Sequence, residues 1–249
     1  MKGFCLEVSG PFACFTRPEM KVERVSYDVI TPSAARGIFE AILWKPAIRW
    51  RITKIEVMAP IRWVSIRRNE VNRIASNGAS PILIEDDRVQ RASLILRDVR
   101  YRLTAEFELL TPCSASSNPN VQPEQRQGSE HYDGHRLTPL KDQDEDFSIA
   151  AIGSETERSA KYSAMFERRA TKGQCFQTPY LGTREFACSF ALVKTDHMTS
   201  PIDESRDLGW MLYDMDYADR NCVRPMFFKA EMVKGVISIP HPESEEVKR

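Results

Sequence analysis

The strongest pattern in this 249-residue chain is an alternation of apolar and polar side chains from Val99 to Leu109. The apolar positions are Val99, Tyr101, Leu103, Ala105, Phe107 and Leu109, and the polar ones are Arg100, Arg102, Thr104, Glu106 and Glu108. Successive side chains of a strand point to opposite faces of its sheet, so this pattern predicts a long strand with one buried face. The chain must therefore build a sheet and cover one of its faces with other elements.

Shorter alternations predict further strands at 4–9, 48–57, 61–66 and 186–192. Between Ile52 and Ile55 the alternation changes phase, which indicates a bulge. The polar segments 12–31 and 69–90 are predicted to be loops. In the tail, a hairpin is expected from Met226–Val233 and Val236–Ile239, with Lys234-Gly235 as its turn.

Two segments carry helix start signals. Thr31 followed by Pro32 is typical of an N-cap and first helical position, and the predicted buried stripe is Ala35, Ile38, Phe39 and Ile42. Ser154 and Glu157 are spaced as a capping box, and the helix that they open is expected to end near Lys172, before Gly173.

The resulting order predicts an α+β protein with a ferredoxin-like (RRM-like) βαββαβ domain. We expect that domain at 1–195, with an insertion at about 112–155 whose first part is polar and without periodicity, and a small C-terminal antiparallel β-sheet domain at 196–249. Since this fold hosts many functions, it does not by itself indicate one.

Charge is balanced in total but not along the chain. Lys plus Arg and Asp plus Glu both number 35, which argues against a uniformly basic surface. From Arg17 to Arg73 there are 12 basic and 6 acidic residues, and from Arg158 to Arg184 there are 6 basic residues against Glu167 alone. If the fold joins these two windows, they form a phosphate-binding surface; the alternative is ordinary solvated faces. Composition does not decide between them.

Several classes of protein are disfavoured. No apolar run approaches the roughly 20 residues of a membrane span, and Glu7 interrupts any N-terminal signal-peptide core. Six cysteines without a C-x-x-C pair indicate reduced thiols, so we expect a cytoplasmic protein without a membrane partner. P-loop, hydrolase-elbow and base-stacking RNA motifs are absent. His131 and His135 lie in the polar segment, where a metal site is not expected.

Lys161 and Tyr162 are candidates for chemistry on RNA. RNA is cut without a metal when a base activates the ribose 2′-hydroxyl, a cation stabilises the charged phosphorane and an acid protonates the leaving oxygen. Lys and Tyr suit the last two roles. However, the spacing of Tyr162 from Met165 and Phe166 is also that of a core aromatic, and spacing alone favours this structural interpretation.

A family resemblance changes that balance. It is carried by blocks that cover nearly everything except about 112–155. These blocks are Gly10–Tyr27, Thr31–Ile38, Trp44–Trp50, Ser65–Val71, Phe166–Ala170, Gly173–Phe176, Pro179–Phe186 and Asp207–Leu212. In them the chain closely resembles the Cas five family, subfamily d, of type I-C CRISPR systems.

The resemblance implies an endoribonuclease that cuts precursor CRISPR RNA within each repeat. It also implies that the protein keeps the 5′ handle as a subunit of the type I-C surveillance complex, beside a backbone and a large subunit. Cleavage would need no cofactor or metal and would leave a 2′,3′-cyclic phosphate. Lys161 carries over as the phosphate-stabilising residue, and Tyr162 stands where the family often has an acid–base His. Leu43 replaces the family's Tyr or His, which leaves Tyr27 as a further proton-transfer candidate.

Two interpretations stay open. The first is an active ribonuclease, with catalytic candidates Lys161, Tyr162 and Tyr27. Its RNA-binding candidates are Arg17, Lys21, Arg24, Arg67, Arg68 and Arg169. The second is a structural subunit that holds the 5′ handle and cuts slowly or not at all, as Leu43 and Tyr162 suggest. Metal-assisted DNA cleavage is a distant third, because no suitable carboxylate cluster stands out.

Overall fold

The computed structural model describes residues 3–72, 83–110, 154–193, 199–217 and 222–249. The strands are β1 (Phe4–Ala13), β2 (Ile48–Val57), β3 (Trp63–Val71), β4 (Arg88–Leu109), β5 (Ser189–Leu192), β6 (Arg206–Asp216), β7 (Arg224–Met232), β8 (Val236–Ser238) and β9 (Val247–Lys248). The helices are α1 (Pro32–Ile42), α2 (Ile84–Asp87) and α5 (Glu155–Thr171). The mixed class with mostly antiparallel sheets is therefore confirmed. Among these helices, none is long and apolar enough to cross a membrane.

The larger sheet has the strand order β5-β1-β4-β2-β8, and β3 pairs with the first half of β4. Every one of these pairings is antiparallel. The predicted central strand is confirmed but is 22 residues long, because its first half, from Arg88 to Leu96, pairs with β3. The register of β2 against β4 shifts between Ile52 and Lys54, which confirms the predicted bulge.

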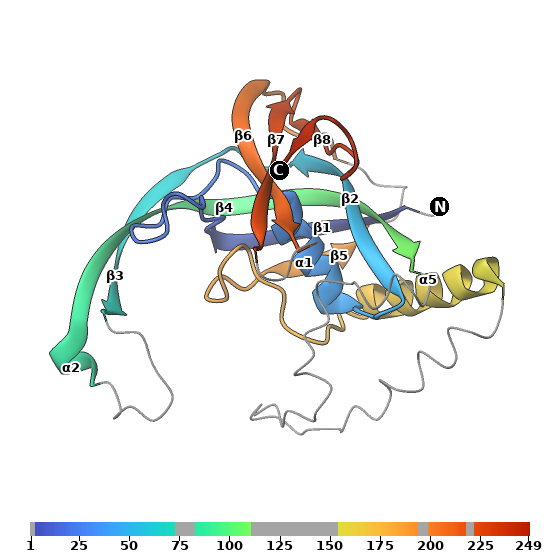
Figure 1. The fold of residues 1–249 in the computed structure, drawn as a ribbon, viewed down its shortest axis with the longest axis horizontal. Coiled ribbons are helices and arrows are strands. Elements are labelled where there is room, and N and C mark those ends of the chain that lie inside the picture. Colours follow the sequence, from blue (N-terminus) through green and yellow to red (C-terminus); the bar gives the residue numbers. More distant parts are fainter. Residues whose placement is uncertain (1–2, 73–82, 111–153, 194–198, 218–221) are drawn as a thin grey trace.

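Helices α1 and α5 cover one face of this sheet (Figure 1). Phe166 of α5 lies at the centre of the core, with ring centroids 4.7 Å from Trp50, 4.9 Å from Phe4 and 5.6 Å from Phe39 of α1. Edge and offset contacts between such rings add to the free energy of burial. The core therefore ties both helices to the two central strands β1 and β2.

Both helix starts follow the sequence. The side chain of Thr31 accepts a hydrogen bond from the Ala34 amide, and Pro32 is the first residue of α1. Ser154 and Glu157 form the complete capping box of α5. Past the end of α5, Gly173 has a φ of 64°, as the predicted stop requires.

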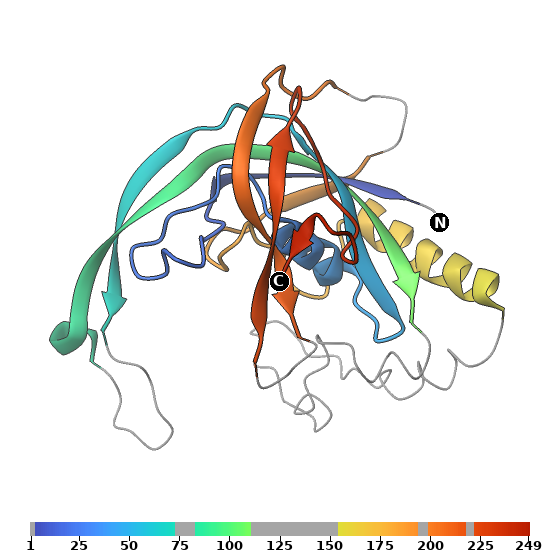
Figure 2. The same cartoon turned by 45° about the horizontal axis from the view of Figure 1, so that its top comes forward.

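β3 and the first half of β4 curve away from the rest of the sheet as a two-stranded ribbon (Figures 1 and 2). The loop predicted for 69–90 is therefore wrong at both ends, since β3 continues to Val71 and β4 begins at Arg88. Cross-strand pairing extends both strands through residues whose polar composition resembles a loop, while 73–82 lie outside the described residues.

The predicted C-terminal hairpin is confirmed at its turn and wrong beyond it. Lys234 and Gly235 have positive φ, and Val233 and Val236 form an antiparallel bridge across them. Beyond that bridge, β8 pairs with β2 of the larger sheet, and β7 pairs with β6 and β9. A local turn does not decide which exposed strand edge its second arm will join. The boundary at residue 196 remains a prediction, and β8 connects the C-terminal residues to the main sheet.

Candidate functional site

Five charged side chains form a cluster on the outer half of the ribbon, where Arg68 pairs with Arg91 across the two strands. Arg68 of β3 contacts Glu70 at 2.9 Å and also pairs with Glu185. Arg24 lies 3.5 Å from Glu70 and 3.9 Å from Glu185, and Arg91 of β4 lies 3.5 Å from Glu70. We call these residues the arginine cluster. Its three cations exceed its two carboxylates, so it retains a positive charge.

The arginine cluster links the first basic sequence window to the residue that follows the second. Arg24 and Arg68 belong to the first window, and their shared partner Glu185 follows Arg184, the last residue of the second window. Arg184 itself is exposed. The end of the second window therefore lies against cations of the first, which favours the phosphate-binding interpretation of the charge pattern.

Arg67 and Arg68 do not serve the same surface. Neighbouring residues of a strand point to opposite faces, and β3 follows this rule: Arg68 and Glu70 face the cluster, and Arg67 is exposed on the other face. Lys21, in the loop after β1, is also exposed. Arg67 and Lys21 make no ion pair within the described part of the chain.

Tyr27 is a buried platform for Arg17. The Arg17 guanidinium carbon lies 4.6 Å from the centre of the Tyr27 ring, and the same side chain pairs with Asp28 at 3.4 Å. Tyr27 is only 2% exposed, and this burial raises the pKa of its hydroxyl. The stacked geometry positions Arg17, while the raised pKa lowers the fraction of Tyr27 that is ionised and able to accept a proton.

Helix α5 presents Lys161 to solvent and directs Tyr162 inward. Tyr162 is 2% exposed and its ring stands edge-on to Phe107 at 6.5 Å, while the Lys161 Nζ lies 6.0 Å from the Tyr162 ring centre. This burial matches the core role that spacing favoured for Tyr162. Arg169, near the end of α5, donates to the Ile42 carbonyl at 3.1 Å and so caps α1.

The catalytic candidates occupy two places. Tyr27 donates its amide to the Phe15 carbonyl, and the Phe15 ring lies 6.1 Å from that of Tyr101. Tyr162 contacts Phe107, six residues further along β4, which corresponds to about 20 Å of strand. Lys161 and Tyr162 are thus together on α5, and Tyr27 is not brought to them. Leu43 is fully buried, with its carbonyl accepting from Trp50 Nε1 at 2.8 Å.

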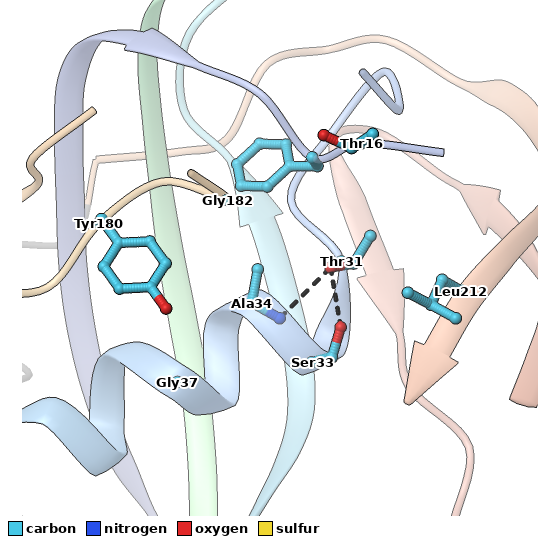
Figure 3. A pocket seen from close by; sticks show the side chains of 9 residues that line it. Thr16, Thr31, Ser33, Ala34, Gly37, Tyr180, Gly182 and Leu212 are labelled. Atoms are coloured by element: carbon cyan, nitrogen blue, oxygen red, sulfur yellow. Dashed lines mark hydrogen bonds between the residues drawn. The ribbon is translucent and has the colours of Figure 1, made fainter. Parts of the chain in front are cut away.

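A cavity of about 290 Å³ opens at the start of α1 (Figure 3). We call it the α1 pocket. The residues that line it are Phe15, Thr16, Thr31, Ser33, Ala34, Gly37, Tyr180, Gly182 and Leu212. They come from the segment after β1, from α1 and its N-cap, from the segment before β5 and from β6, so the pocket exists only in the folded chain.

Sequence reasoning missed the α1 pocket and three members of the arginine cluster, Glu70, Arg91 and Glu185. One signal was available for the pocket, because Gly37 interrupts a helical pattern in which alanine would be more stable.

The sequence also made predictions about a metal site and about the state of the cysteines. His131 and His135 lie outside the described residues. Within the described ranges, no group of three or more His, Cys, Asp and Glu gathers as a metal site. The five described cysteines, Cys5, Cys14, Cys175, Cys188 and Cys222, are free thiols, in agreement with the reduced state expected from their spacing.

Comparison with known proteins identifies the family. The family model described as CRISPR-associated protein (Cas_Cas5) matches residues 3–117 and 137–240. The chain belongs to this Cas5d family. A curated Cas5d relative from Mannheimia succiniciproducens is 42% identical over 262 residues, covering 98% of this chain and 97% of that protein. A second, from Thermus thermophilus, is 35% identical over 262 residues, covering 98% of this chain and 94% of that protein. Both relatives are named CRISPR pre-crRNA endoribonuclease Cas5d.

Two solved structures share the fold of this Cas5d family member. One is a crystal structure of a CRISPR-associated protein, with 22% identity and a TM-score of 0.63, covering 100% of this chain and 97% of that one. The other is a functionally uncharacterized protein from Streptococcus mutans, with 21% identity and a TM-score of 0.62, again covering 100% and 97%. At these identities the likeness concerns the fold alone.

Proposed function

We propose that this chain is an endoribonuclease that cuts precursor CRISPR RNA within each repeat and then retains the 5′ handle. It would do so as a subunit of the type I-C surveillance complex, beside a backbone subunit and a large subunit. The observation that carries this proposal is the nearly full-length similarity to two relatives that are named CRISPR pre-crRNA endoribonucleases.

The topology supports an RNA-processing domain of the ferredoxin-like kind. The neighbouring strands β5, β1, β4 and β2 are antiparallel, and α1 and α5 connect β1 to β2 and β4 to β5. This is the connectivity of a βαββαβ unit in which β3 and β8 are additions. We therefore infer that the ribbon is an extension of a ferredoxin-like sheet, placed where it can lie along bound RNA.

The arginine cluster and its neighbours would bind phosphate groups. In the free protein, Glu70 and Glu185 hold the guanidinium groups in place, so less side-chain entropy is lost when RNA binds. Arg24 and Arg91, with side chains 32% and 24% exposed, are the members that a phosphate can reach. Arg17 and Lys21 are further candidates for phosphate contacts, Arg67 would contact RNA from the opposite face of β3, and Arg169 acts by capping α1.

The proposed chemistry is metal-independent transesterification and needs no cofactor. A base takes the proton of the 2′-hydroxyl, and the 2′-oxygen forms a bond to phosphorus. The bond from phosphorus to the 5′-oxygen breaks, and the leaving oxygen takes a proton, which yields a 2′,3′-cyclic phosphate and a 5′-hydroxyl. Lys161 would stabilise the phosphorane charge from its exposed position on α5. The burial of Tyr162 and Tyr27 favours supporting roles for them, in holding α5 and Arg17.

A specific observation also favours the alternative of a handle-holding subunit with little activity. The two tyrosines considered for proton transfer are each 2% exposed, and Leu43 at the third position is fully buried. Neither tyrosine hydroxyl is thus presented to solvent beside Lys161 as a ready proton donor or acceptor. The two functions share the same RNA-binding surface and differ in whether the bound repeat is cut.

Single-turnover cleavage of the cognate repeat RNA in EDTA separates these functions. We expect the all-RNA strand to be cut and a strand with a 2′-deoxy substitution at the scissile position to stay intact. Lys161→Ala should slow cleavage by about 100-fold or more while binding changes little. Lys248→Ala, which removes an exposed cation from β9, is the matched control. Tight binding without cleavage would refute the nuclease assignment and support the handle-holding alternative.

A further inference from the structure

The α1 pocket has the chemistry of a nucleobase site. Its lining combines the aromatic rings of Phe15 and Tyr180 with the hydroxyls of Thr16, Thr31 and Ser33. None of the described residues that line it is charged. A phosphate would need cations, whereas a base needs an aromatic face for stacking and hydroxyls that can donate or accept at its edge. The volume of about 290 Å³ lies at the small end of ligand pockets, roughly 300–1,000 Å³, which suits a single base.

Gly37 indicates that the pocket is kept open. It lies within α1 and is exposed, and a Cβ atom built on it meets no protein atom within 4 Å. Glycine destabilises a helix relative to alanine, and no neighbouring protein atom requires the bare position. In Figure 3 the Tyr180 side chain stands beside this stretch of α1, with its hydroxyl directed towards the helix. A planar group that approaches α1 beside Tyr180 would use the space that a side chain at position 37 would fill.

Gly182 holds the opposite wall in place. Its φ is 85°, and an added Cβ would collide with the Cys14 carbonyl, so only glycine allows the segment around Tyr180 to approach the end of β1 this closely. The Cys14 amide donates to the Leu181 carbonyl at 3.0 Å and fixes that approach. The wall that carries Tyr180 is therefore preformed before any ligand arrives, which reduces the entropy lost on binding.

Cations flank the pocket without entering it. Arg17 follows the lining residue Thr16 and is held over Tyr27 and beside Asp28. Arg184, two residues after the lining residue Gly182, is exposed. The arginine cluster begins at the next residue, Glu185. A nucleotide whose base enters a neutral pocket needs this arrangement, because its phosphates stay at the mouth.

We propose that the α1 pocket binds one splayed-out nucleotide of the CRISPR repeat RNA, with its base against Tyr180 and α1 and its phosphates near Arg17 and Arg184. This inference rests on the proposed function, since it assumes that repeat RNA is the ligand. It adds a base-reading subsite to a surface that otherwise contacts phosphates.

Binding of abasic RNA tests the proposal directly. Each nucleotide of the repeat is replaced in turn by an abasic residue, and affinities are measured for the full-length protein and for Gly37→Leu, which fills the pocket from a helix position. The wild-type protein should lose about 5- to 150-fold in affinity at one position, the range for one stacked base. Gly37→Leu should bind the unmodified repeat more weakly by a similar factor and should no longer respond to the abasic change at that position.

Tyr180→Ala provides a second route to the same result, and Tyr217→Ala, which removes a tyrosine exposed at the end of β6, is its matched control. Tyr180→Ala should reproduce the position-specific loss, and Tyr217→Ala should not. If the wild-type protein binds the repeat but both pocket variants respond to every abasic position as it does, the pocket assignment is wrong and the proposed function stands. If the wild-type protein does not bind the repeat at all, the proposed function fails and this inference fails with it.

Discussion

Gly37→Ala should make the protein more stable while weakening its RNA binding. The added methyl group meets no atom within 4 Å, so it brings neither packing nor a clash, and the effect on folding comes from backbone entropy alone. Replacing an exposed glycine inside a helix by alanine then stabilises the fold by about 0.5–1 kcal/mol. For a chain of this size, that corresponds to a rise of roughly 1–4 °C in Tm.

Thermal and urea unfolding, each followed by circular dichroism, measure this change, and Gly182→Ala is the matched control. Gly182 has a φ of 85° and no room for a Cβ, so alanine there should lower stability by about 1–3 kcal/mol or more. The two glycines thus make opposite predictions for the same substitution. A loss of stability in Gly37→Ala would refute the reasoning, because it would mean that the helix packs against something at this position.

The opposite signs of the stability and binding effects make the result hard to explain by misfolding. A more stable variant that binds repeat RNA less well has lost a property of its surface and not of its fold. If Gly37→Ala is more stable and binds with unchanged affinity, the space above α1 has room for both the methyl group and the RNA, and a Leu at this position becomes the decisive test.

Three further predictions concern two arginines and the cysteine thiols. Arg67→Ala should reduce the slope of log affinity against log salt by about 1, because it removes one exposed phosphate contact and no ion pair of the described residues. Arg68→Ala should in addition lower the free energy of unfolding by about 1.5 kcal/mol, the lower end for charged hydrogen bonds, since one partner carboxylate is 42% exposed; an unchanged unfolding curve would contradict this. Burial raises the pKa of Cys188 from 9.0 to about 12, so its thiolate fraction at pH 8 falls about a thousandfold. Iodoacetamide followed by mass spectrometry should therefore modify exposed Cys222 in the folded protein and Cys188 only after unfolding, or far above pH 8.

Local patterns in the sequence predicted the elements that depend on near neighbours. The alternation at Val99–Leu109, the Thr31–Pro32 helix start and the Ser154–Glu157 capping box are all present, because each depends on residues that are close in the chain. The bulge in β2 was likewise visible as a change of phase. The same signals predicted the inward face of α5, including the burial of Tyr162.

The sequence prediction failed where a strand pairs with a segment that lies far away in the chain. The C-terminal hairpin is an example. Its turn at Lys234-Gly235 is predicted correctly, but the strand after the turn, β8, pairs with β2 of the larger sheet. The ribbon extended past its predicted ends for the same reason, because pairing with a partner strand stabilised residues whose own composition favours a loop.

The sequence by itself therefore determined the two long helices with their starts, the alternating strands with their buried faces, and the family that the chain resembles. Only the tertiary structure decided that Arg24 and Arg68 share carboxylate partners, that Tyr27 is not brought to Lys161 and Tyr162, and that Gly37 and Tyr180 line one cavity. The physical reason is the separation along the chain of the residues that interact. Caps, periodicity and turns depend on interactions between residues a few positions apart, whereas a binding surface is made by side chains that only the packing of the sheet and helices brings together.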